Sequence, residues 1–154
     1  MIVFVLRHAD RTEADDLKHP EGTERAELLG RMLADSGISV AFRSQYVRAE
    51  KTLARLKEQL GNALKVRTIS FLDTEDAEAY GRRVADAVKA LPATAVVAVV
   101  GHSDTVEPTI RSLGGGSIPE IKPHEFDKLF VLFIDPPGPG AKISTLRLRY
   151  GAAT

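Results

Sequence analysis

The sequence predicts one three-layer α/β/α domain over residues 1–154, with a mainly parallel central sheet and helices on both of its faces. Short apolar runs rich in β-branched residues alternate with longer stretches in which apolar residues recur at helical spacing. No repeat and no low-complexity linker divides the chain. Strands that alternate with helices are joined by right-handed crossovers and pair in parallel, with helices on both faces.

The predicted strands are short apolar runs at 2–6, 38–42, 65–71, 95–100, 129–134 and 143–150. The runs 2–6 and 95–100 are apolar throughout, as expected of strands that are buried on both faces. The last two runs flank a turn of Pro and Gly at 136–140, so we expect them to form an antiparallel edge of the sheet.

The predicted helices cover 21–36, 44–60, 75–91 and 104–113. Ser44 is a residue type that caps helix N-termini, and it precedes a stretch with Leu53, Leu56 and Leu60 on one side. Glycine follows the first, second and fourth stretches and proline follows the third, as expected at helix ends.

The composition excludes several classes of protein. The 21 Lys and Arg residues balance 21 Asp and Glu residues, which argues against nucleic-acid and membrane-surface partners because both require a basic field. The absence of cysteine excludes disulfides, thiolate metal sites and a cysteine nucleophile. The apolar N-terminal run is too short for a signal-peptide core or a membrane span, so we expect a cytoplasmic protein.

Two histidines and two arginines occupy the positions where α/β proteins bind ligands, beyond the carboxyl ends of strands. Arg7 and His8 follow the first strand, His102 follows the strand 95–100, and Arg48 lies one turn into the helix after the second strand. Each residue alone has an ordinary structural interpretation. Together they predict a small positive pocket suited to a phosphoryl group.

Four sequence blocks resemble signatures of the histidine phosphatase superfamily, which includes the phosphoglycerate-mutase-like enzymes. Residues 6–9 (Leu-Arg-His-Ala) resemble its Arg-His-Gly signature, with Ala9 in place of the usual glycine. Residues 44–52 resemble its Ser-x-x-x-Arg-Ala-x-x-Thr block. Residues 100–103 resemble its second-histidine motif, and 21–26 resemble the start of its first long helix.

The resemblance implies a phosphatase that works through a covalent phosphohistidine and needs no metal or other cofactor. His8 would attack phosphorus, and water would hydrolyse the intermediate. Arg7 and Arg48 would bind the phosphoryl oxygens, and His102 would complete the cradle as a ring N–H donor. Helix N-terminal amides near Asp104 would add partial positive charge.

The general acid that protonates the leaving group is the least defined part of this prediction. Asp73 is the candidate after the third strand, although residues 74–76 also resemble a helix cap. Asp10 and Asp104 are rivals because each lies next to a catalytic candidate. His19, three residues before Gly22, is expected to be a loop residue rather than a site residue.

The short chain and the undefined acid resemble the small SixA-like phosphohistidine phosphatases. The resemblance implies a phosphohistidine protein or a small labile phosphate as substrate, because such leaving groups depart with little acid assistance. Two alternatives are a catalytically weak phosphate-binding regulatory module and, less favoured by the chain length, a phosphoglycerate-type mutase. Phe126 is expected to pack beneath the sheet, and Asp127 is expected to order the pocket rim.

Overall fold

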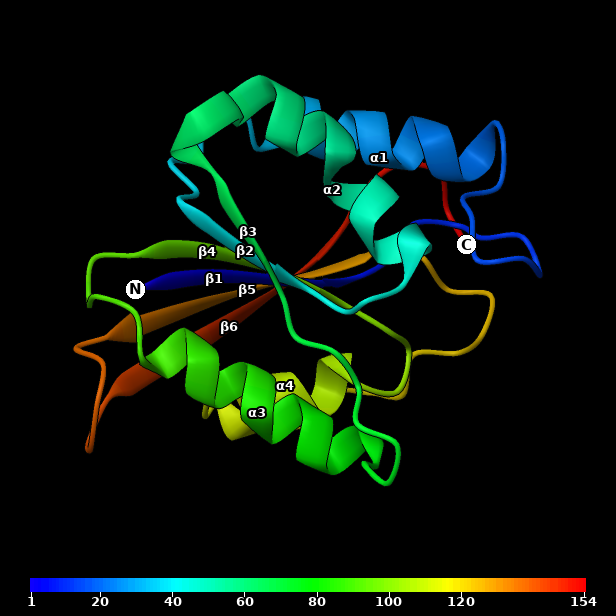
Figure 1. The fold of residues 1–154 in the computed structure, drawn as a ribbon. Helices are drawn as coiled ribbons and strands as arrows, with labels where there is room; N and C mark the ends of the chain where they lie inside the picture. The colour runs from blue at the N-terminus through cyan, green and yellow to red at the C-terminus, as the bar shows by residue number, and fades with distance from the viewer.

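Six strands form one mixed sheet, and two α-helices cover each of its faces (Figure 1). The computed structural model describes residues 1–154. The elements in chain order are β1 (Ile2–Arg7), α1 (Glu21–Met32), β2 (Val40–Arg43), α2 (Val47–Leu60), η1 (Gly61–Ala63), β3 (Lys65–Thr68), α3 (Ala77–Lys89), β4 (Val96–Gly101), α4 (Val106–Ser112), β5 (Lys128–Asp135) and β6 (Lys142–Arg149). None of the helices combines the length and the hydropathy that a bilayer crossing requires.

The strand order is β3-β2-β4-β1-β5-β6. The first four strands in this order pair in parallel, whereas β5 and β6 run antiparallel to their neighbours. The predicted α/β/α fold and its antiparallel edge are therefore confirmed. The carboxyl ends of β1, β2 and β4 lie at one edge of the sheet, where the parallel strands end together.

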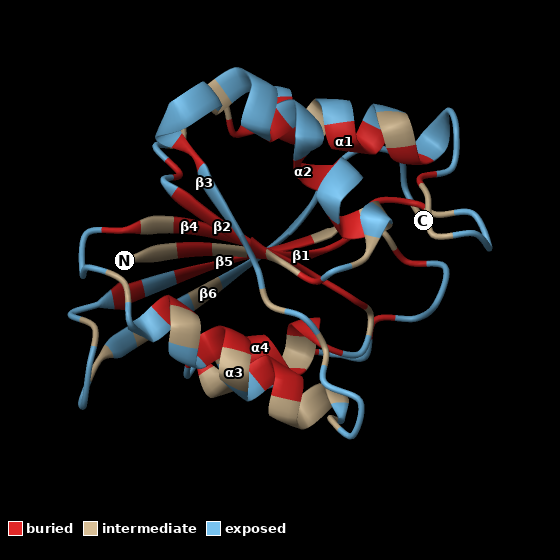
Figure 2. Cartoon of the chain, in the orientation of Figure 1, coloured by how far each residue is buried: buried red, intermediate tan, exposed pale blue.

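The sheet separates two apolar cores (Figure 2). Val3 and Val5 of β1 belong to the core beneath α3 and α4, whereas Leu6 belongs to the core beneath α1 and α2. In β4, Val97 and Val99 contribute to the first core, and the alternate positions contribute to the second. This period of two is what a strand buried on both faces requires, and it holds β1 and β4 rigidly at the centre of the molecule.

The third strand ends at Thr68, three residues before the end that the sequence predicts at 71. β3 is an exposed edge strand, and the apolar residues that follow it pack against α3 instead of extending the sheet. The hydroxyl of Tyr80 donates to the carbonyl of Ile69 at 2.7 Å, and the ring of Phe71 stacks on Tyr80 with centroids 3.8 Å apart. The segment after β3 is thereby turned across the end of the sheet.

The second helix begins at Val47, whereas the sequence predicts a start capped by Ser44. The residue at the N-cap position is Tyr46, which makes no side-chain capping bond. Ser44 is fully buried, and its hydroxyl lies 2.7 Å from Nε2 of His102. The capping prediction for Ser44 is therefore wrong, because its hydroxyl bonds to His102 after β4 instead of to a backbone N–H of the helix.

Candidate active site

The ends of β1 and β4 place two histidines side by side. Arg7 pairs with Gly101 in the sheet register, and the backbone N–H of His8 donates to the carbonyl of Gly101 at 2.9 Å. The ring centroids of His8 and His102 are consequently 5.2 Å apart. A pocket of about 330 Å³ lies here, lined by Arg7, His8, Arg11, Tyr46, Arg48, Phe71, His102, Ser103 and Asp104. The structure thus brings together the two histidines and two arginines that the sequence singles out.

Arg7 is held by one of its terminal nitrogens. Nη1 donates to the carbonyls of Lys122, Pro123 and Glu125 at 3.2, 2.8 and 2.9 Å, and the guanidinium lies 4.0 Å above the ring of Phe126. Nε is buried and has no hydrogen-bond partner. Nη1 fixes the side chain, so Nη2 is the terminal nitrogen left for a ligand.

The pocket is strongly positive even before a ligand is considered. Burial and the nearby Arg11 lower the pKa of Arg7 to about 10, so Arg7 is still cationic at neutral pH. Arg48 contributes a second guanidinium, whose Nε is buried without a partner. Such a concentration of charge favours a multiply charged anion over a neutral ligand.

The hydrogen bond of His8 determines which ring nitrogen is reactive. Nδ1 lies 2.8 Å from the carbonyl oxygen of Ala9. A carbonyl only accepts, so Nδ1 carries the proton and Nε2 of the neutral ring carries a free lone pair. Burial lowers the pKa of His8 to about 3, opposed by the bond to Ala9 and reinforced by Arg7 and Arg48. The ring is therefore neutral, with an unprotonated Nε2, in a cationic pocket.

His102 is neutral for the same reasons, with its proton on the other nitrogen. Nδ1 lies 3.5 Å from Nη2 of Arg48, which can only donate, so Nε2 carries the proton and donates to Ser44 at 2.7 Å. Burial, and then the nearby His8, lower the pKa of His102 to about 3. In this arrangement the ring N–H of His102 serves Ser44, and Nδ1 accepts from Arg48.

Thr52 connects the two halves of the site. Its hydroxyl accepts from the backbone N–H of Ala9 at 2.9 Å and donates to the carbonyl of Arg48 at 2.7 Å. Ala9 is fully buried with Leu17 and Ala26, so its methyl group fills a small apolar cluster beside the nucleophile. The Thr at the end of the 44–52 block thus fixes the backbone that carries His8 relative to α2.

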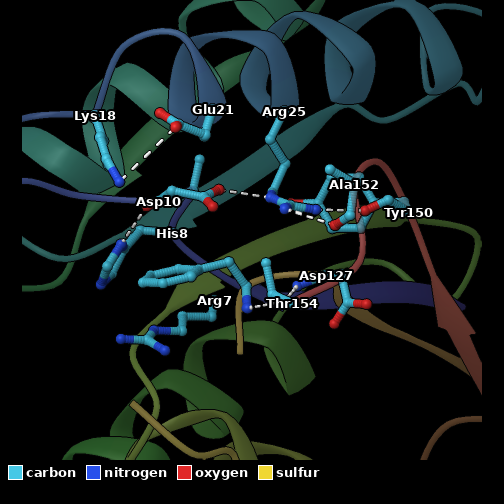
Figure 3. A network of polar contacts seen from close by, with 12 residues as sticks. Arg7, His8, Asp10, Lys18, Glu21, Arg25, Asp127, Tyr150, Ala152 and Thr154 are labelled. Atoms are coloured by element: carbon cyan, nitrogen blue, oxygen red, sulfur yellow. Dashed lines mark hydrogen bonds and ion pairs between the residues drawn. The ribbon is translucent and has the colours of Figure 1, made fainter. Parts of the chain in front are cut away.

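The carboxylates differ in their access to the pocket. Asp10 is buried and pairs with Arg25 at 2.6 Å, and Arg25 also donates to the carbonyl of Tyr150 (Figure 3). Asp73 lies exposed in the turn before α3 and does not line the pocket. Asp104 lines it. Of the three candidate acids, the structure brings only Asp104 to the pocket.

The remaining polar candidates lie elsewhere. His19 is exposed, and its Nδ1 is 2.9 Å from the hydroxyl of Thr23. Asp127 is buried against Arg149, at 3.0 Å, rather than at the pocket rim. No group of three or more His, Asp or Glu side chains is arranged to hold a metal ion.

Three aromatic residues surround the histidines, a position that the sequence pattern does not predict for them. Tyr46 and Phe71 make edge contacts to His102, with centroids 5.4 and 5.6 Å away. Phe126 is not beneath the sheet as predicted; its ring lies 5.9 Å from that of His8. The ring of Phe126 packs against the guanidinium of Arg7 instead of joining the core. The position of Tyr46 within the 44–52 block was the one available signal.

No protein-family model matches the sequence, and no curated protein matches it. Solved structures do match the fold. A SixA protein from Nakamurella multipartitia has 23% identity and a TM-score of 0.64, covering 98% of this chain and 96% of that one. The protein histidine phosphatase SixA complexed with tungstate has 22% identity and a TM-score of 0.59, covering 97% of each chain.

A mycobacterial glucosyl-3-phosphoglycerate phosphatase has 14% identity and a TM-score of 0.61, and the match covers 99% of each chain. The chain therefore has the fold of the histidine phosphatases over nearly its whole length. The resemblance drawn from the four sequence blocks is confirmed at the level of the fold.

Proposed function

We propose that this protein is a cofactor-independent phosphatase that transfers a phosphoryl group to His8 and then to water. The observation that carries the proposal is the bond from Nδ1 of His8 to the carbonyl of Ala9. This bond leaves a neutral Nε2 in a pocket that also holds Arg7 and Arg48. A nucleophile and the cations that bind phosphoryl oxygens are the two parts that such a reaction requires.

In the first step, the lone pair of His8 Nε2 attacks phosphorus in line with the leaving group. A P–N bond forms as the bond to the leaving group breaks, and the electron pair of that bond departs with the leaving group. Arg7 and Arg48 bind the equatorial oxygens, where negative charge is concentrated in the transition state. In the second step, water attacks phosphorus, the P–N bond breaks and its electron pair returns to Nε2. The protons of the water stay on the released inorganic phosphate or pass to solvent.

His102 acts as a donor once the phosphoryl group is bound. A nearby phosphoryl dianion favours the cationic form of a histidine. Cationic His102 keeps Nε2–H on Ser44 and gains an N–H at Nδ1, the nitrogen that faces Arg48. This change converts Nδ1 from an acceptor into a donor for a phosphoryl oxygen, and Arg48 Nη2 exchanges its contact with Nδ1 for one with the phosphoryl group.

The leaving group receives weak acid assistance. Asp104 lines the pocket and is our candidate for this role, whereas the predicted Asp73 is exposed outside it. Groups that leave easily need such assistance least. We therefore propose a phosphohistidine protein or a small labile phosphate as substrate, in line with the protein histidine phosphatase SixA that shares the fold.

The test is to incubate the protein with phosphoramidate or acetyl phosphate and to search by mass spectrometry for an acid-labile phosphoryl group on His8. We expect labelling and turnover in the wild type and neither in His8→Ala. His19→Ala removes an exposed histidine outside the pocket and should behave as the wild type. Full hydrolytic activity in His8→Ala would refute the nucleophile assignment. Phosphate binding with neither label nor product would indicate a phosphate-binding module instead.

A panel of phosphohistidine peptide, acetyl phosphate and sugar phosphates tests the substrate class. We expect kcat/KM to be highest for the labile donors, since these require no strong general acid. A preference for sugar phosphates would contradict the proposed substrate class and leave the role of His8 intact.

A further inference from the structure

The helix that carries Arg48 is capped by a residue from a distant loop. The N-terminal N–H groups of a helix have no partner within the helix, and the N-cap residue Tyr46 supplies none. Asp15, in the loop between β1 and α1, accepts from the backbone N–H of Val47 at 2.8 Å and from that of Arg48 at 3.1 Å. An aspartate 32 residues earlier in the chain than Val47 therefore takes the place of a local cap.

The same carboxylate also holds the side chain of Arg48. Nη1 donates to Asp15 Oδ1 at 2.9 Å, and the guanidinium lies 4.2 Å from the ring centroid of Tyr46. Burial would raise the pKa of Asp15, but the bonds from Arg48 and Val47 outweigh it and lower the pKa to about 2. The carboxylate is therefore ionised at neutral pH, and Arg48 is restrained by one ion pair and one aromatic face.

A nitrogen of Arg48 that Asp15 does not use faces the pocket. Nη2 lies 3.5 Å from Nδ1 of His102, and Nε is buried without a partner. A guanidinium has five N–H donors in a fixed plane, so anchoring one of them sets the direction of the others. Asp15 thus restrains Arg48 without occupying the donors that face the histidines.

We propose that Asp15 is a positioning residue, which orients Arg48 for the phosphoryl group and ties the β1–α1 loop to the phosphate pocket. The inference rests on the proposed function, in which Arg48 binds phosphoryl oxygens. It extends that function to a residue outside the pocket lining.

A positioning role and a purely electrostatic role predict effects of opposite sign. A carboxylate beside an arginine reduces the positive potential of the pocket, so its removal would strengthen anion binding if charge alone mattered. If Asp15 positions Arg48, its removal weakens anion binding, because the freed guanidinium must be ordered again by each ligand. The direction of the change therefore decides between the two roles.

The experiment measures the affinity for orthovanadate, a phosphate-shaped anion, by calorimetry, together with kcat and KM for acetyl phosphate. We expect Asp15→Asn to weaken vanadate binding and to raise KM by about tenfold each, the size typical of a lost hydrogen bond between charged groups. Asp15→Glu should recover part of the loss. Thermal unfolding of each variant is measured as a control for retention of the fold.

Asp16→Asn is the matched control. Asp16 lies in the same loop and carries the same charge, but it pairs with Lys51 at 2.6 Å and does not contact Arg48. We expect less than a twofold change in vanadate affinity. Unchanged or tighter vanadate binding in Asp15→Asn, or equal losses in the two asparagine variants, would overturn the positioning role.

A double-mutant cycle separates positioning from a loss of helix stability. If Asp15 acts through the side chain of Arg48, then Asp15→Asn in an Arg48→Gln background should change kcat/KM by less than twofold. If Asp15 acts only as a cap, its loss should persist in that background and refute the inference. A wild-type protein that binds no vanadate would instead refute the proposed function itself.

Discussion

His8 and His102 are kept neutral by burial among positive charges, which is what a nucleophilic imidazole requires. The pKa of each is lowered to about 3 in the folded protein. In the unfolded chain a histidine has a pKa of about 6.5. At pH values between about 3 and 6.5 the unfolded chain therefore binds protons that the folded protein excludes. The burial that keeps these two rings neutral lowers the stability of the folded protein in acid.

Acidification from pH 7 to pH 5 is therefore expected to destabilise the protein. Each lowered histidine pKa contributes a slope of at most about 1.4 kcal/mol per pH unit below the unfolded pKa, and no effect above it. His102→Gln should flatten the dependence of the unfolding free energy on pH, measured by urea denaturation. His19→Gln removes an exposed histidine and should leave the slope unchanged. If the wild type, His102→Gln and His19→Gln showed equal slopes, the burial of His8 and His102 would not be the cause of the pH dependence.

The elements that form the site differ in how far the sequence predicts them. Arg7, His8 and His102 follow strands whose apolar runs are unmistakable, and adjacent parallel strands must end together, so their proximity could be inferred. Asp15 could not be found in this way, because its partner lies on α2 and the path of the loop depends on tertiary packing. The prediction that Phe126 packs beneath the sheet is wrong because an aromatic residue next to a strand usually belongs to the core. Here its ring packs against the buried guanidinium of Arg7 instead.

Thr52 allows a test of how α2 supports the backbone next to His8. Thr52 and Thr109 are both buried in helices, and each donates its hydroxyl to the carbonyl four residues earlier. Thr52 alone also accepts from the N–H of Ala9. Thr52→Val leaves that buried N–H unsatisfied, which costs about 1–3 kcal/mol.

We expect Thr52→Val to lower both the urea midpoint and kcat, because the backbone beside His8 loses its support. Thr109→Val keeps the shape of its side chain and should lower the midpoint less, with kcat unchanged. A kcat equal to that of the wild type in Thr52→Val would show that the β1 end is rigid without this bond.

At the scale of the whole molecule, one arginine connects the site loop, the first helix and the C-terminal segment. Arg25 of α1 is buried, pairs with Asp10 at 2.6 Å, and donates to the carbonyls of Tyr150 and Ala152 at 2.6 and 2.8 Å (Figure 3). Asp10 follows His8 by two residues, so this buried pair anchors the backbone next to His8 in the chain. The same ion pair holds the Asp10 carboxylate on Arg25, outside the pocket lining.

Breaking this connection on one side should be more harmful than removing both charges. Arg25→Met leaves the Asp10 carboxylate buried without a partner, a change that costs about 3–5 kcal/mol. Adding Asp10→Asn removes the uncompensated charge, so the double variant should be more stable than Arg25→Met despite carrying one more substitution. Urea denaturation of the two variants measures the difference. A double variant less stable than Arg25→Met would contradict an unpaired buried carboxylate as the cause of the loss.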